Sequence, residues 1–339
     1  MPFPYEFNYT FEKIKLDAPI LIVGDRMANH LAKFSDDLAK TISSELSSPI
    51  RIQSLASPRE GIHRTIHRLE SISPWPQILV YQGGSEEFFE PKFLPSEIKT
   101  IRKNFKLFDD DRIETLMILY PELSRLIYHP FERIKLNKES VYQTELSEKE
   151  FLTRLETEIL LYERQLSHLV KMAKDKGSLI ILLTTPVKLN APPKKTCSFT
   201  TSIELEAEEI KIRKHLEDGN LKSAFSEIKQ LTMIYSSNAS LYYLHGEIAL
   251  QLNDYNEAYT AFEKAAAFDC TSWRSTPLQN NIIRKVAKEQ QALLFDMDRF
   301  VQSSGDPRTL FYDDIFPQNL YYERSMQQLG LVIKKILKL

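Results

Sequence analysis

The pattern of hydrophobic and polar positions predicts five short strands, at residues 20–23, 50–55, 77–82, 178–184 and 292–295, and the first of them, I-L-I-V, is an uninterrupted apolar run. An uninterrupted apolar run of this length is typical of a strand that is buried on both faces of a parallel sheet. The segments between these strands have helical spacing, and strands that alternate with helices are joined by right-handed crossovers that cover both faces of the sheet. The pattern predicts a three-layer α/β fold of the flavodoxin-like type.

Helical spacing of apolar residues predicts helices at 27–46, 57–71, 148–176 and 276–290, and a last helix after the loop at 311–318. Gly177 directly follows the long helix and is a natural stop for it. The pattern is also helical and amphipathic across residues 90–176, so we expect a central helical stretch there.

Residues 190–198, which read N-A-P-P-K-K-T-C-S, have the composition of a linker, and an internal repeat follows them. Small and apolar residues recur about 34 residues apart, a period that resembles the tetratricopeptide repeat. The first copy carries Gly219, Leu221, Ala224, Ile228 and Leu231, and the second carries Asn253, Tyr255, Ala258, Phe262 and Ala265, preceded by Tyr242, Gly246 and Ala249. The second copy resembles the family pattern more closely.

We therefore expect a discontinuous sheet domain, in residues 1–190 and 271–339, with an all-α tetratricopeptide insertion at 199–270 between the fourth and fifth strands. About three repeats are needed to bury a continuous core, so two repeats should dock on another part of the molecule.

The repeats have two interpretations. They can form a groove that binds a protein or peptide partner, or they can be a packing module that stiffens the sheet domain or joins copies of the chain in a homo-oligomer. The candidate lining residues of a groove are Tyr242, His245, Gln251, Asn253, Arg213 and Lys214.

The formal net charge of −2 gives no long-range field for nucleic acid or for an anionic membrane. No run approaches the roughly 18 apolar residues of a membrane span, and the N-terminus has no basic region followed by an apolar core, so we expect a cytoplasmic protein without a membrane span. Cys197 and Cys270 are too few for a disulfide framework and lack metal-finger spacing, so we expect both to be reduced. No cofactor is indicated.

His63 and His67 have the i, i+4 spacing of metal ligands on a helix. Ile62 and Ile66 mark the buried face of that helix, however, and place the histidines at its edge. We therefore expect both histidines to lie on the surface, and we expect no metal site.

Polar residues follow the apolar runs where a parallel sheet places its ligand crevice. The first run ends in Gly24-Asp25-Arg26, and the third in Gly83-Gly84-Ser85. Together with a late Asp313-Asp314-Ile315-Phe316-Pro317, these motifs resemble the SGNH (GDSL) hydrolase superfamily of three-layer esterases and carbohydrate-modifying hydrolases.

The resemblance implies a role for each position. In that family the first motif is Gly-Asp-Ser with the serine as nucleophile, and Arg26 stands at the serine position. A glycine after the second strand gives its N–H to the oxyanion hole, as Gly61 would, and an asparagine, here Ser85, completes that hole. A late Asp-x-x-His supplies the base; this chain keeps Asp313 but has Phe316 at the histidine position.

Arginine cannot attack a carbonyl and phenylalanine cannot accept a proton, so the nucleophile and the base are both absent. We expect an inactive hydrolase homologue that serves as a non-enzymatic protein-interaction scaffold. The alternative is an anion-binding or small-ligand-binding protein, or an atypical esterase, that uses the residual pocket. Its candidate residues are Arg26, Gly61, Gly84, Ser85 and Asp313, beside Asp25.

Arg26 itself has two interpretations. It can anchor a carboxylate or phosphate together with backbone donors near Gly61 and Gly84. It can instead form an internal ion pair with Asp313, Asp314 or Glu86, which we favour because an aspartate that has lost its histidine needs a partner.

Overall fold

The structure is a computed structural model that describes residues 4–44, 49–88, 90–108, 134–137, 147–194, 203–269, 273–305 and 309–337. Its centre is a sheet of five parallel strands in the order β4-β3-β6-β8-β9. The strands are β3 (Ile20–Gly24), β4 (Ile52–Ser54), β6 (Ile78–Gln82), β8 (Leu179–Leu183) and β9 (Leu293–Phe295). All five lie at the predicted positions, and the order is that of a doubly wound sheet, so the predicted fold class is confirmed.

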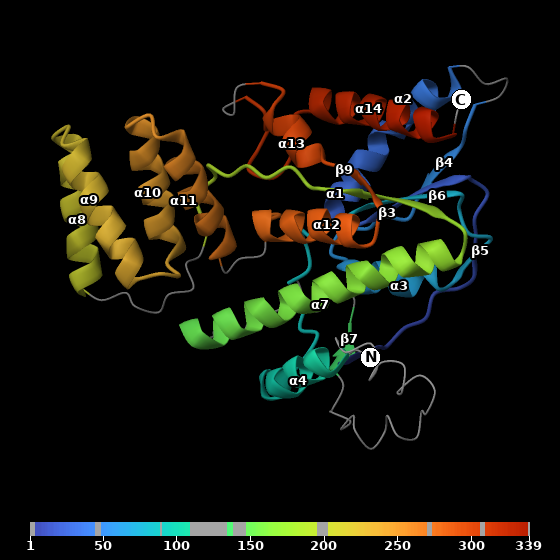
Figure 1. Cartoon of the computed structure of the whole chain (residues 1–339), viewed down its shortest axis with the longest axis horizontal. Coiled ribbons are helices and arrows are strands. Elements are labelled where there is room, and N and C mark those ends of the chain that lie inside the picture. Colours follow the sequence, from blue (N-terminus) through green and yellow to red (C-terminus); the bar gives the residue numbers. More distant parts are fainter. Residues whose placement is uncertain are drawn as a thin grey trace.

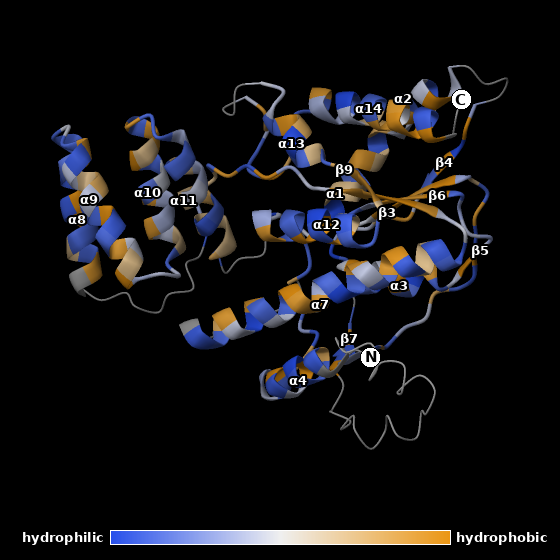
Figure 2. Ribbon diagram, in the orientation of Figure 1, coloured by the Kyte–Doolittle hydropathy of each residue, from blue (hydrophilic) through white to orange (hydrophobic). Residues whose placement is uncertain are grey.

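Alternate residues of β3 face opposite sides of the sheet, as the two-residue period of a strand requires. Leu21 and Val23 pack into one core, and Ile20 and Ile22 pack into the other. Figure 2 shows these strands as the apolar centre of the molecule. The sheet is therefore buried on both faces.

Two groups of helices cover the sheet (Figure 1). One face packs against α3 (Ile62–Leu69), α7 (Glu148–Asp175) and α12 (Pro277–Glu289). The other packs against α1 (Arg26–Leu31), α2 (Ser35–Ser43), α13 (Met297–Gln302) and α14 (Asn319–Leu337). The helix predicted at 27–46 is divided between α1 and α2 by a 3₁₀ turn, η1 (Ala32–Phe34).

Four short strands outside the central sheet are absent from the prediction. β1 (Tyr5–Phe7) pairs with β7 (Ile134–Leu136), and β2 (Ile14–Lys15) pairs with β5 (Ile72–Ser73), both in parallel. The prediction of a helical stretch at 90–176 is therefore wrong at β7. The rest of that stretch, as far as the structure describes it, holds η2 (Pro95–Glu97), α4 (Ile98–Phe108) and α7.

Helices α8 (Ile203–Glu217), α9 (Leu221–Ile234), α10 (Ala239–Gln251) and α11 (Tyr255–Ala267) lie between β8 and β9. We call these four helices the helical insertion. It has a core of its own, and Figure 1 shows it beside the sheet layers. A Cβ at Gly246 would lie 2.6 Å from the Phe262 ring, so a small residue is needed where α10 crosses α11.

Both ends of the helical insertion meet at what we call the neck, residues 188–194 and 273–276. The buried Arg274 side chain donates hydrogen bonds to the carbonyl oxygens of Lys188 (2.6 Å) and Ala191 (3.0 Å). Tyr243 of α10 donates to the Asn190 carbonyl at 3.3 Å, and Leu189 packs against the α10–α11 contact. The helical insertion is thus fastened to the sheet domain.

Within the described residues, no helix is both long and apolar enough to cross a membrane. Both cysteines, together with the residues between α4 and β7, lie outside the described part of the chain.

Candidate functional site

The candidate site lies at the carboxyl edge of the sheet, where β3 and β6 end. Gly24 closes β3 with a φ of +134°, and a Cβ there would lie 1.7 Å from the Gln82 carbonyl oxygen. Only glycine allows this close approach of the two strand ends. The next residue, Asp25, is the N-cap of α1, and its side chain accepts the Met27 N–H at 2.8 Å.

Asp25 also holds Ser85, the residue at the predicted asparagine position. One oxygen of the Asp25 carboxyl accepts both the Ser85 backbone N–H (2.8 Å) and the Ser85 hydroxyl (2.6 Å). Both side chains are buried, and burial raises the pKa of Asp25 to about 6 despite these hydrogen bonds. The Ser85 hydroxyl is therefore engaged by a carboxyl inside the protein.

Arg26 forms an internal ion pair, one of its two predicted interpretations. Its Nε lies 3.5 Å from the Glu86 carboxylate, and its terminal nitrogen donates to the Trp273 carbonyl oxygen at 2.8 Å. Glu86 is buried, and burial together with the charge of Asp25 raises its pKa to about 7. The guanidinium thus joins the start of α1 to the segment after β6 and to the neck.

Asp313 does not contact Arg26 among the interactions of the described residues. One oxygen of its carboxylate accepts the backbone N–H groups of Ile315 (2.7 Å) and Phe316 (2.6 Å), which stabilises the loop. Asp314 pairs instead with Lys188 at 2.8 Å. The aspartate that the family resemblance marks as part of a triad therefore serves the local backbone.

The Phe316 ring packs against His30 of α1, with ring centroids 4.8 Å apart. Burial lowers the pKa of His30 below its ordinary value. Within the described part of the chain, no hydrogen bond joins Asp313 to a serine or histidine side chain. The structure therefore brings Asp313 and Phe316 together without assembling a base.

Gly61 is the N-cap of α3, and an internal carboxylate occupies the backbone donor beside it. Glu87 accepts the Ile62 N–H at 2.8 Å, and Gly61 itself lies so close that an added Cβ would be 3.1 Å from Glu87 Oε2. Lys92 neutralises this carboxylate at 3.1 Å, and it also lies 3.5 Å from Glu158 of α7. The Glu87 carboxylate therefore occupies the position beside Gly61 where an external anion would bind.

His63 is buried, so its predicted surface position is wrong. Its ring contacts the Glu90 carboxylate, which also accepts a hydrogen bond from buried Arg64. Burial lowers the pKa of His63 to about 4. Burial alone would raise the pKa of Glu90, but the bonds from His63 and Arg64 outweigh it and lower that pKa to about 2. No group of residues that could hold a metal ion occurs among those described.

The N-terminal segment covers this network. Phe7 stacks on His67 with ring centroids 3.9 Å apart and planes 2° from parallel, and the Arg64 guanidinium donates a hydrogen bond to the Tyr9 hydroxyl oxygen. The sequence carries a signal for this cover, because an aromatic residue stands at every second position of the segment. These residues are Tyr5, Phe7, Tyr9 and Phe11.

The six candidate partner-binding residues of the helical insertion fall into two groups, one buried and one exposed. Tyr242 and His245 are buried, with the Tyr242 hydroxyl donating to the Thr232 carbonyl at 3.3 Å and the His245 ring 3.2 Å from Glu257. Their proposed place in an open groove is therefore wrong, because both hold α9, α10 and α11 together. Arg213, Lys214, Gln251 and Asn253 are exposed.

Two features of the site were missed from the sequence. Glu86, Glu87 and Glu90 follow β6 and all three are buried, although acids in a loop usually point to solvent. On the helical insertion, large apolar side chains are exposed at Ile210, Met233, Ile234, Leu250, Tyr255 and Tyr259.

A scan against models of known protein families finds no match, and neither does a search of curated proteins. Among solved structures, the chain is similar to a lipase/acylhydrolase from Enterococcus faecalis, at 8% identity over 93% of this chain and 95% of that chain, with a TM-score of 0.40. It is also similar to a GDSL-like lipase from Bacteroides thetaiotaomicron, at 8% identity over 94% and 88% of the two chains, with a TM-score of 0.40.

A third similar structure is the acetylxylan esterase Axe2 from Geobacillus stearothermophilus, at 12% identity over 95% of each chain, with a TM-score of 0.38. At these identities and TM-scores the similarity carries no argument of its own. The strand order of the sheet shows the fold.

Proposed function

We propose that this protein is a non-enzymatic scaffold, in which an α/β domain without catalytic groups presents the helical insertion to a protein partner. The observation that supports this proposal is the state of Arg26. It stands at the position of the family's nucleophile, it is paired with buried Glu86, and it bonds the backbone of the neck. A residue at the catalytic position therefore serves to attach the insertion.

The side chains at the site do not supply acyl-transfer chemistry. A nucleophile needs a base within hydrogen-bonding reach, and removal of one member of a triad already leaves only weak catalysis. Ser85 brings a hydroxyl to the site, but it is buried and donates to Asp25. The backbone donor beside Gly61 is used by Glu87.

The helical insertion is the part that carries features of a binding surface. We assign it as a pair of tetratricopeptide-like hairpins, on the repeat in its sequence and on its four antiparallel helices. Exposed apolar side chains scattered singly are normal, but groups of them mark interaction sites. Of the thirteen large apolar side chains that are exposed in the described residues, six belong to α8–α11. We propose that the partner contacts some of these six.

Hydrolysis of an aryl acetate tests the catalytic half of this proposal. We expect the wild-type chain and the Ser85→Ala variant to show the same rate as buffer. Turnover by the wild-type chain that Ser85→Ala abolishes, with circular dichroism unchanged, would establish the alternative of an atypical esterase.

A capture experiment tests the binding half. Tyr255 and Tyr259 lie exposed on α11, and Tyr312 lies exposed on the sheet domain, so Tyr312→Ser is a matched control for the double variant Tyr255→Ser/Tyr259→Ser. We expect one protein to be captured by the wild-type chain and by Tyr312→Ser, and to be lost with the double variant. Light scattering of the purified chain separates this result from self-association, which would appear without a second protein.

A further inference from the structure

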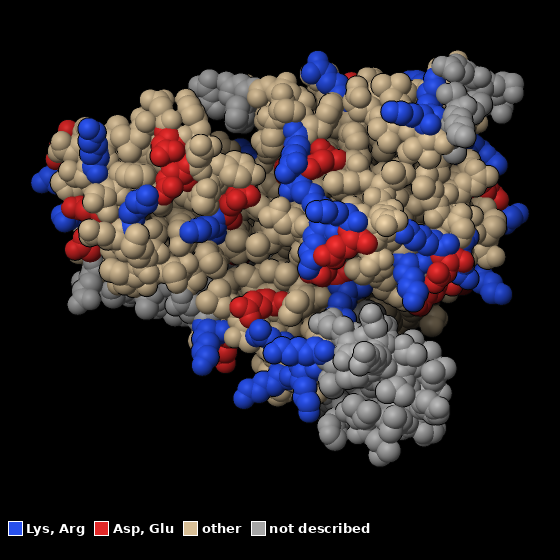
Figure 3. Space-filling view, viewed as in Figure 1, with Lys and Arg blue, Asp and Glu red and all other residues tan. Residues whose placement is uncertain are grey.

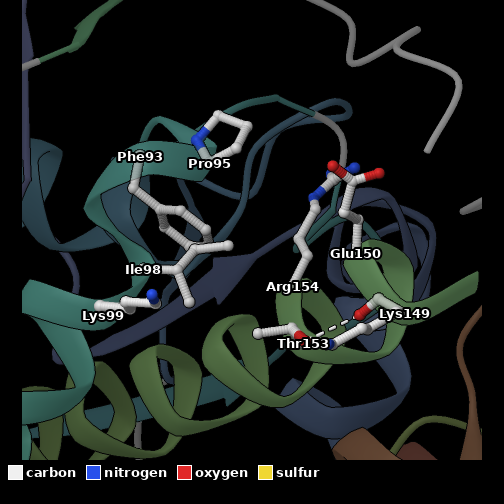
Figure 4. Close-up of a pocket in the computed structure, with 8 residues that line it drawn as sticks. All are labelled: Phe93, Pro95, Ile98, Lys99, Lys149, Glu150, Thr153 and Arg154. Atoms are coloured by element: carbon white, nitrogen blue, oxygen red, sulfur yellow. Dashed lines mark hydrogen bonds between the residues drawn. The ribbon is translucent and has the colours of Figure 1, made fainter. Parts of the chain in front are cut away.

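A pocket of about 200 Å³ lies between the start of α4 and the first turns of α7, away from the edge of the sheet (Figure 4). Its residues come from the segment before η2, from η2 and from α4 on one side, and from α7 on the other. They are Phe93, Pro95, Ile98, Lys99, Lys149, Glu150, Thr153 and Arg154. None of them belongs to the candidate site described above.

The body of the pocket is apolar. Phe93 and Ile98 are buried and belong to the small core beneath α4, together with Ile101 and Phe105. The Thr153 hydroxyl does not offer a free polar group, because it donates to the Lys149 carbonyl oxygen at 2.7 Å. A ligand seated here would meet hydrocarbon on its inner side.

The rim of the pocket is cationic. Lys99 and Lys149 are both exposed, and neither makes an ion pair within the described part of the chain. Glu150 also lines the pocket and carries one negative charge, and its carboxylate accepts the backbone N–H (3.0 Å) and the hydroxyl (2.6 Å) of Ser147. The lining stays net positive, because this one carboxylate stands against three cations, Lys99, Lys149 and Arg154.

The surroundings of the pocket add to this positive charge. Helix α4 reads I-K-T-I-R-K-N-F-K-L-F, with four cations and no acid. Figure 3 shows Lys and Arg side chains gathered over α4, whereas cationic and acidic side chains lie together at the start of α7. Charge complementarity therefore favours an anion, and the apolar floor favours one with a hydrocarbon body.

We propose that this pocket binds a small amphipathic monocarboxylate, whose tail lies on Phe93 and Ile98 and whose carboxylate lies between Lys99 and Lys149. A dry apolar cavity of about 150 Å³ holds one benzene molecule. A pocket of about 200 Å³ therefore suits a body of roughly six to eight carbons. This site is independent of the proposed scaffold function, since it shares no residue with the helical insertion.

Calorimetric titration of the full chain with octanoate tests the proposal, with octanol as a probe that keeps the tail and removes the charge. For a ligand of this size we expect a dissociation constant of about 0.1–1 mM for octanoate and a weaker one for octanol. No octanoate binding up to about 10 mM, or octanol binding as tightly as octanoate, would overturn the proposal.

The double variant Lys99→Gln/Lys149→Gln tests the cationic rim. Two near-surface ion pairs are lost, so octanoate affinity should fall about tenfold while octanol affinity stays the same. Lys103→Gln is the matched control, because Lys103 is exposed on the same helix but does not line the pocket. An equal loss of octanoate affinity in Lys103→Gln would show a diffuse charge effect and overturn the proposed site.

Thr153→Trp tests the apolar body without a change of charge. Thr153 is half-buried on the surface of α7, and an indole ring there would fill the pocket. We expect this variant to lose the binding of both octanoate and octanol while its circular dichroism spectrum stays that of the wild type. A folded Thr153→Trp chain that binds octanoate as before would overturn the location.

Discussion

Asp25 and Glu86 are buried carboxyls within one corner of the sheet edge, and burial raises the pKa of each, to about 6 and about 7. Arg26 and the backbone donors around them reduce this effect but do not cancel it. Such a corner binds protons more tightly in the folded chain than in the unfolded chain. The raised pKa values of these two side chains therefore make the stability of the folded domain depend on pH.

The first prediction concerns pH. Because the folded pKa values of Asp25 and Glu86 lie above their ordinary values, the folded chain holds more protons between about pH 4 and pH 7, and stability falls as the pH rises through that window. These two carboxyls should together contribute a loss of about 1–3 kcal/mol between about pH 5.5 and about pH 8. His63, whose folded pKa of about 4 lies below its ordinary value, works in the opposite direction, so urea unfolding isolates the share of Glu86 as the difference between the wild-type chain and Glu86→Gln at the two pH values.

Glu86→Gln should make this decline shallower, because the glutamine does not titrate. Glu90 works in the opposite direction, since its folded pKa of about 2 means that its stabilisation is lost as the pH falls below its ordinary range. A pH profile of Glu86→Gln identical to that of the wild-type chain would contradict the assignment of Glu86.

The second prediction concerns Arg26→Ala. Removing the guanidinium leaves the buried Glu86 carboxylate without its cation and removes the bond to the Trp273 carbonyl. We expect a destabilisation of about 2 kcal/mol at about pH 8, where Glu86 is ionised, and a smaller one at about pH 5. Chemical denaturation at the two pH values measures both, and equal losses would mean that the ion pair contributes nothing.

At the scale of elements, the sheet depends on close backbone contact where its strands end. β3 and β6 share the register from Ile20–Ile78 to Gly24–Gln82, and the chain then turns into α1 at Asp25. The same turn brings the side chains of Asp25 and Arg26 to the segment that follows β6. The position of the candidate site is therefore a consequence of strand register.

The third prediction compares two glycines with positive φ. Gly24→Ala would place a Cβ 1.7 Å from the Gln82 carbonyl oxygen, whereas a Cβ at Gly177, with a φ of +71°, meets nothing within 4 Å. We expect Gly24→Ala to cost more than about 3 kcal/mol or to prevent folding, and Gly177→Ala to cost about 1 kcal/mol. Thermal unfolding of both proteins gives the comparison, and similar losses would argue against the close strand approach.

At the scale of the whole molecule, the two parts of the chain are joined by the neck and by Arg26. Arg274 binds the incoming segment at Lys188 and Ala191, and the Trp273 ring lies 4.1 Å from the Lys194 ammonium group. The two segments of the neck, one entering the helical insertion and one leaving it, are thus held against each other. This arrangement gives the helical insertion a fixed attachment, as a scaffold requires.

The fourth prediction concerns Arg274→Ala. The loss of two buried hydrogen bonds should loosen residues 188–194 without unfolding the sheet, so hydrogen exchange should become faster there. Arg299→Ala is a suitable control, since the Arg299 side chain is 76% exposed. Unchanged exchange at residues 188–194 in Arg274→Ala would show that the neck is held by other contacts.

The sequence predicts β3, β6 and β8 because each is a largely apolar run, as burial on both faces demands, whereas β4, at the edge of the sheet, reads I-Q-S and is only partly buried. β1 and β7 escape prediction because they are three residues long and pair across more than a hundred positions of the chain. The burial of His63 is not predicted, because it depends on contacts with Glu90 and Arg64, and the periodicity of the sequence contains no information on such partners. The ion pair of Arg26 could be proposed, but the choice of Glu86 over Asp313 needed coordinates.

The meeting of residues 188–194 and 273–276 has one more consequence. A segment that leaves and re-enters a domain at neighbouring points can be excised or exchanged as a cassette, because a short peptide suffices to reconnect the severed ends. The α/β layers and the helical insertion can therefore vary independently in evolution, and the same α/β domain can carry different insertions in different chains.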